Sequence, residues 1–151
     1  MVDTAAMMAQ VKASADAFAS GTPTITLAAA KILLGFQPQA VSNTVLSSLS
    51  AVAPLMLIYP IQRMARQNEN IAIQATEIGA LLKFGLPKDT ADTLANILGF
   101  VDALTSRMEA GTGMTGVGPP LVSWRVDSAI YTAASPSVLS FEFTFDFVGC
   151  G

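Results

Sequence analysis

The sequence contains no histidine and only one cysteine, Cys150, next to its C-terminus. Without histidine, neither a serine–histidine–aspartate nor a cysteine–histidine nucleophile can be built. A single cysteine can form neither an intrachain disulfide nor a thiolate zinc site within one chain. Chemistry based on lysine or carboxylates finds no supporting motif. We therefore expect no enzyme activity, no catalytic residue, no metal site and no cofactor.

Charge is also scarce. Charged residues make up 13% of the chain and apolar residues 52%, whereas an ordinary soluble domain has about a quarter of its residues charged. The basic residues are scattered singly apart from Arg63 and Arg66, so no basic patch favours direct binding of nucleic acid. A surface this poor in charge is normally covered by neighbouring subunits or by lipid.

The most apolar window, residues 45–61, has two interpretations. It lies within a stretch from Ile32 to Gln62 that has no charged residue. A membrane span needs about 20 mainly apolar residues, but this window has 17 residues and includes Pro54 and Pro60. The alternative is a core element that is helical from about Val41, breaks near the prolines, and packs against a sheet or between subunits.

Two helices are predicted after Pro60. Apolar residues at helical spacing predict a first helix over about 61–84 and a second over about 89–109, joined by a short turn as an antiparallel hairpin. Asp89 is placed to cap the start of the second helix, and Arg107 lies in its last turn, where a positive charge suits the helix dipole. Residues 111–120 hold four glycines and two prolines, which predicts a connector.

The C-terminal region predicts a β-hairpin of strands over about 121–131 and 138–148. Residues 139–147 alternate apolar and polar without error, and four of the eight phenylalanines stand on the apolar side. Arg125 and Asp127 can pair with Glu142 and Asp146 across the polar face. Two strands alone are marginally stable in water, so the hairpin has to join a larger sheet or lie on the helices.

Two local features are candidate sites, one for a dinucleotide cofactor and one for thiol chemistry. Residues 111–116 spell G-x-G-x-x-G, but the dinucleotide fingerprint needs a strand before it and a helix after it, and here a predicted helix comes first. A flexible connector is the better interpretation. Cys150 is either an inert thiol near the chain end or a contact between subunits, including an intermolecular disulfide.

The alanine-rich helical body, the glycine-rich connector and the closing hairpin of 122–126 with 139–147 together resemble the small structural proteins of tailed bacteriophages, those of the neck, tail end or baseplate. The resemblance implies a hairpin that joins sheets between the subunits of a ring. It carries over no functional residue.

We therefore expect one α+β domain over 1–151, with a mainly helical part over 1–110, the connector over 111–120 and a β-hairpin over 121–151. Its expected function is that of a non-enzymatic structural subunit of a phage virion, which packs against copies of itself and other assembly proteins. The alternative is a small membrane-associated protein that uses 45–61 as a span or inserted segment. The interface residues predicted from the sequence are Trp124, Phe141, Phe143, Phe145, Phe147, Leu55, Leu57 and Ile58.

Overall fold

The fold is described from a computed structural model, over residues 3–35, 50–68, 71–85, 91–110, 119–126 and 138–150. These residues form an α+β fold, as predicted, in which strands outnumber helices. In chain order the elements are α1 (Thr4–Ala15), β1 (Phe18–Ser20), β2 (Ile25–Leu27), the 3-10 turn η1 (Ala29–Lys31), β3 (Ile32–Leu34), β4 (Leu55–Asn68), β5 (Ile71–Gly85), α3 (Ala91–Glu109), β6 (Leu121–Val126) and β7 (Val138–Cys150).

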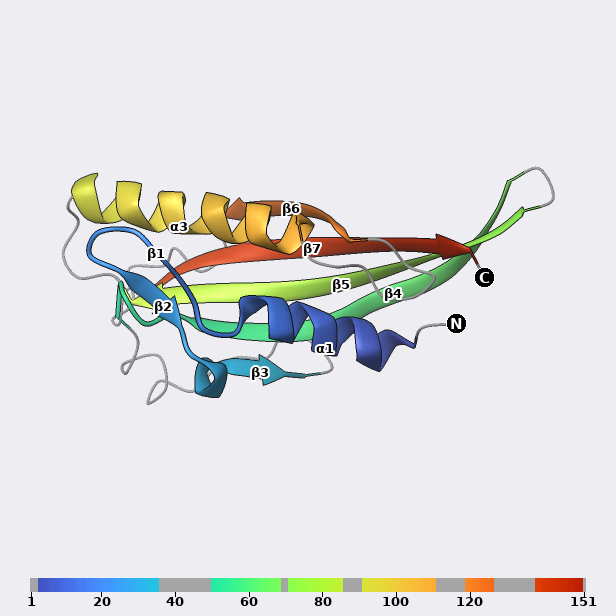
Figure 1. Cartoon of the computed structure of the whole chain (residues 1–151), viewed down its shortest axis with the longest axis horizontal. Helices are drawn as coiled ribbons and strands as arrows, with labels where there is room; N and C mark the ends of the chain where they lie inside the picture. The colour runs from blue at the N-terminus through green and yellow to red at the C-terminus, as the bar shows by residue number, and fades with distance from the viewer. Residues whose placement is uncertain are drawn as a thin grey trace.

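A five-stranded sheet forms the centre of the molecule, in the order β3-β4-β5-β7-β6. All neighbouring strands are antiparallel except β3 and β4, which are parallel. The short strands β1 and β2 form a separate antiparallel pair. Figure 1 shows α1, α3 and the β1–β2 pair together in front of the long strands, with the far end of the β4–β5 hairpin projecting beyond them.

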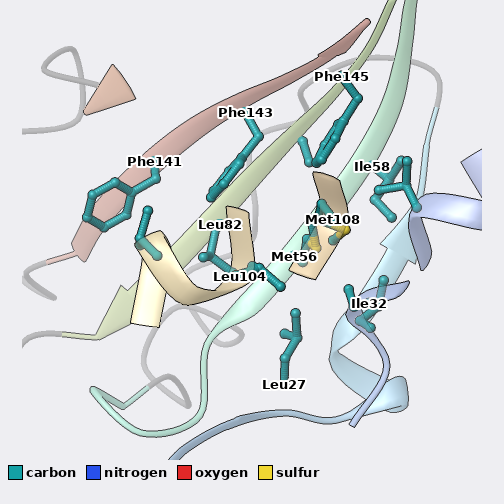
Figure 2. Packing of buried hydrophobic residues seen from close by; sticks show 14 of the residues in the cluster. Leu27, Ile32, Met56, Ile58, Leu82, Leu104, Met108, Phe141, Phe143 and Phe145 are labelled. Atoms are coloured by element: carbon teal, nitrogen blue, oxygen red, sulfur yellow. The ribbon is translucent and has the colours of Figure 1, made fainter. Parts of the chain in front are cut away.

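One face of the sheet, which we call the covered face, packs against the two helices. It holds every second residue of the three long strands, because successive side chains of a strand point to opposite faces. Figure 2 shows Phe141, Phe143 and Phe145 leaving β7 on the same side, together with Leu104 and Met108 of α3. Helix α1 adds Met7, Val11 and Ala15 to the same core.

The prediction of a helical body with a helix hairpin is wrong. Of the two helices of that hairpin only the second exists, as α3, whereas residues 61–68 and 71–84 lie in β4 and β5, which pair antiparallel from Leu55 with Lys83 to Asn68 with Ile71. Helix propensities differ by only a few tenths of a kcal/mol for most residues. That preference is small beside the burial that β5 gains between two long neighbours, where Leu81, Leu82 and Phe84 are all buried.

In the described part of the window, residues 50–61, Leu55 to Tyr59 are buried in the core, as the second interpretation predicted, but they lie in a strand and not in a helix. Residues 55–60 form the first part of β4, and Ile61 sits at an irregularity in its pairing with β5. Residues 45–49 lie outside the described part of the chain. No helix among the described residues is long and apolar enough to cross a membrane.

The C-terminal strands pair antiparallel, as predicted for a hairpin, but within a larger sheet than expected. Leu121 lies opposite Asp146 and Val126 opposite Phe141, and the other side of β7 pairs with β5 over thirteen residue pairs. Residues 127–131 of the first predicted strand lie outside the described part. Strand β7 is therefore an interior strand of the sheet, and β6 is an outer one.

Candidate functional site

The interface residues predicted from the sequence lie mostly in the chain's own core. Phe141, Phe143, Phe145 and Phe147 are buried on the covered face, and Leu55, Leu57 and Ile58 are buried in β4. Trp124 is partly buried and packs edge-on against Phe141, with ring centroids 5.4 Å apart. Burial within the chain is sufficient to explain their apolar character, and a contact with another subunit through them stays a prediction.

The aromatic residues of this core form a connected series. The ring of Phe84 in β5 lies edge-on to Phe141 of β7 at 5.9 Å and to Phe100 of α3 at 6.0 Å. Phe143 and Phe145 are stacked at 6.0 Å. Such pairs add about 0.5–1.5 kcal/mol each beyond the apolar area that they bury. The Phe84–Phe100 pair holds α3 against β5 of the sheet.

The opposite face of the sheet, which we call the polar face, has charged and hydroxyl side chains along β7 and β6. The Arg125 guanidinium pairs with the Glu142 carboxylate at 3.1 Å, which confirms that predicted pair. Asp127, predicted to take part with it, lies outside the described residues. Because the Arg125 side chain is 76% exposed and that of Glu142 27%, solvent screening limits the pair to about 0–1 kcal/mol.

A lysine and a serine lie side by side on the polar face, two residue types that can form a catalytic pair. Lys83 of β5 lies directly across from Ser140 of β7, and both are buried. A lysine that activates a serine has to be within hydrogen-bonding distance of its hydroxyl group. The Ser140 Oγ has no hydrogen-bond partner in the structure, so the Lys83 amine does not form a hydrogen bond with it. The two residues do not form a serine–lysine dyad in this conformation.

The other candidate sites named from the sequence form no catalytic or metal-binding group in the described part of the chain. The G-x-G-x-x-G run lies outside the described residues, just after α3 ends at Glu109. Asp89, the predicted helix cap, also lies outside them. Cys150 is the last residue of β7 and is paired with Ile73 of β5. Among the described residues, no group of three or more histidine, cysteine, aspartate or glutamate side chains could hold a metal ion.

The two outer strands of the sheet carry exposed apolar side chains. On β6, Leu121 is 71% exposed and Val126 is 42% exposed, and on β3, Leu33 and Leu34 are about half exposed. No described strand pairs with the outer side of β6 or β3. Leu121 and Val126 belong to the predicted hairpin, but alternation shows which face a side chain takes and not whether its strand lies at an edge. The sequence therefore did not single them out.

A third apolar surface lies at the base of the projecting β4–β5 hairpin. Met64, Ala75 and Val148 form one row across β4, β5 and β7 on the polar face. Met64 and Val148 are exposed, whereas Ala75 between them is buried.

These surfaces are apolar and lie on strands, and none of them brings together groups suited to catalysis in the described part of the chain. What they offer to a partner is backbone hydrogen bonding along an outer strand together with apolar contact. No protein-family model matches the chain, and no curated protein does so either.

Proposed function

We propose that this chain is a non-enzymatic structural subunit of a multi-protein assembly, a component of a tailed-phage virion at its tail, neck or baseplate. It acts by packing against copies of itself and against other assembly proteins, through its sheet edges. Neither nucleic acid nor a small-molecule substrate is part of this function.

The observation that carries the proposal is the pair of outer strands. Proteins that remain monomeric usually protect such edges with lysine, proline, a bulge or a covering element. Here both β3 and β6 present large exposed apolar side chains, and no described strand pairs with their outer sides. An edge of this kind is a template for another strand, so assembly through these edges is the use that its chemistry favours.

Composition supports the same proposal. Apolar residues make up 52% of the chain and charged residues 13%, which leaves little charge to keep a free surface soluble. The virion part of the proposal depends on the closing pair β6 and β7, since the helical body that contributed to the resemblance is replaced by β4 and β5.

Light scattering on purified protein at micromolar concentration, without detergent, tests the proposal. We expect a mass that is a multiple of the 15.7 kDa chain, and negative-stain images of the same sample should show particles of uniform size. A stable monomer over that concentration range would rule out the assembly function. A uniform oligomer that appears in no virion preparation would rule out the virion part alone.

A further inference from the structure

We propose that two copies of this chain pair through the outer sides of their β6 strands, antiparallel, about a twofold axis at Ser123. This inference rests on the proposed assembly function and names one of its contacts. The result would be one continuous ten-stranded sheet, with both pairs of helices on the same face.

Strand β6 lacks the features that usually prevent such pairing. Its inner side pairs with β7 over six consecutive residues without a bulge, so the strand is held straight. It contains neither proline nor lysine. Its one charge, on Arg125, is already paired with Glu142 at 3.1 Å. Pro119 and Pro120 precede it, and because proline has no N–H to donate, the pairing is expected to start at Leu121.

Symmetry and the alternation of side chains restrict the possible registers. Residues directly opposite each other in antiparallel strands point to the same face of the sheet. A twofold axis perpendicular to the sheet keeps each face on its own side. The axis therefore lies between the two β6 strands, midway between one residue and its own copy directly opposite. Within β6 the central candidates are Ser123 and Trp124.

The register centred on Ser123 pairs Leu121 inside β6, which at 71% is the most exposed large apolar residue of the described part, whereas a register centred on Trp124 would pair Val126, exposed at 42%, instead. Leu121 then lies opposite Arg125 of the second copy, whose aliphatic stem can cover it while the guanidinium stays in water. Val122 then faces Trp124 of the second copy and extends the apolar covered face. The two Arg125 residues are kept apart. Centring on Trp124 would leave Leu121 with no opposite residue inside β6.

The charge and type of the opposed side chains also favour a second copy of the chain as the occupant of this edge. Every pair in the chosen register is either apolar with apolar, hydroxyl with hydroxyl, or an aliphatic residue with arginine, so no like charges face each other. Like charges directly opposite would have been destabilising. The same strand therefore serves as both template and partner, as a twofold interface requires.

Cross-linking tests the axis. In a Cys150→Ser background, Ser123→Cys would place two thiols opposite each other, with Cβ atoms about 4.5–5.5 Å apart. We expect a covalent dimer under mild oxidation or with a short bismaleimide. Ser106→Cys, on an exposed position of α3, is the matched control. Cross-linking at residue 123 that does not exceed that at residue 106 would overturn the proposal.

Charge variants at Leu121 test the register. Leu121→Lys would set a lysine opposite Arg125 of the second copy, twice per dimer, and should weaken the dimer about tenfold or more in sedimentation experiments. Leu121→Glu faces the same arginine with opposite charge and should weaken it much less. Leu94→Lys, on an exposed apolar residue of α3 that belongs to none of these surfaces, should leave the dimer unchanged. Equal weakening by lysine and glutamate would overturn the register.

These outcomes separate the two proposals. If the wild-type protein is an oligomer that neither cross-links through residue 123 nor responds to Leu121→Lys, the β6 contact is wrong and the assembly function remains. If the wild-type protein is a stable monomer, both proposals are wrong.

Discussion

Strands β7 and β6 are neighbours in one sheet and have similar alternating sequences, yet they occupy different environments. β7 has a paired strand on each side, and its four phenylalanines are buried against α3 and α1. Among the described strands, β6 is paired on one side only, and Leu121 and Val126 are exposed. The difference separates residues that hold the fold together from residues available to a partner.

The comparison shows that the most apolar stretch of a chain need not be its interaction surface. The phenylalanines of β7 are apolar because they form the core, where each fully buried ring contributes a few kcal/mol. The apolar side chains of Leu121 and Val126 in β6 are exposed instead, and so they are available to a partner. Four substitutions test this difference between the interior strands and β6.

Phe143→Ala should have the largest effect on stability. Phe143 has no exposed surface and stacks on Phe145, so its loss leaves a cavity and should lower the free energy of unfolding by about 3–5 kcal/mol. Urea denaturation measures this. Val148→Ala in the same strand, at an exposed position, should change stability by less than about 0.5 kcal/mol. Similar losses for the two variants would contradict the interior position of Phe143.

Gly79→Ala tests the register of the interior strands β4 and β5. Gly79 lies opposite Tyr59, and an added Cβ would stand only 2.6 Å from two carbon atoms of the tyrosine ring. We expect destabilisation of about 1–3 kcal/mol by overpacking. In a Tyr59→Ala background the same glycine substitution should cost much less. No difference between the two backgrounds would mean that the ring does not cover this glycine.

Asn96→Ala tests the layer that covers β7. The Asn96 side chain accepts a hydrogen bond from Thr22 N at 3.0 Å and donates one to the Pro23 carbonyl at 2.8 Å, which ties the turn between β1 and β2 to α3. Loss of both bonds should lower the free energy of unfolding by about 1–2 kcal/mol. Thermal denaturation measures it, with Ser106→Ala on the same helix as control. An equal change in the two variants would exclude a specific role for Asn96.

Arg125→Ala should have the smallest effect on folding. Its ion pair with Glu142 is largely exposed, so we expect a loss of less than about 1 kcal/mol, which falls further at high salt because exposed pairs are screened. Denaturation at low and high ionic strength measures it. A loss comparable with that of Phe143→Ala would show that β6 contributes to folding as an interior strand does.

A segment's structure could be predicted from the sequence where its pattern of apolar residues fits one kind of element only. Residues 139–147 alternate strictly, and this pattern correctly predicts a strand with its phenylalanines buried. Residues 61–84 contain alanine, glutamine and methionine with isoleucines at spacings that fit a helix as well as a strand. For such segments the pairing with distant strands decides the structure, and this pairing cannot be read from the segment itself.

The same reason limits what could be predicted of the candidate surface. Of the apolar residues at helical spacing that predict the second helix, Ile97, Val101, Leu104 and Met108 are buried in α3, but Leu94 is exposed. The cross-strand pair of Arg125 and Glu142 could be predicted because both residues belong to one local antiparallel pair. The exposure of Leu121 and Val126 could not, because it depends on β6 being last in the strand order.

By itself the sequence determined the alternation and the faces of the two C-terminal strands, the helix that ends near Glu109 and the composition that excludes histidine- and thiolate-based sites. The pairing of 55–68 with 71–85 as two long strands, the interior place of β7 and the place of β6 at the end of the described strand order depend on the tertiary structure. Periodicity is a local property set by side-chain direction, whereas strand order depends on contacts between residues far apart in the chain.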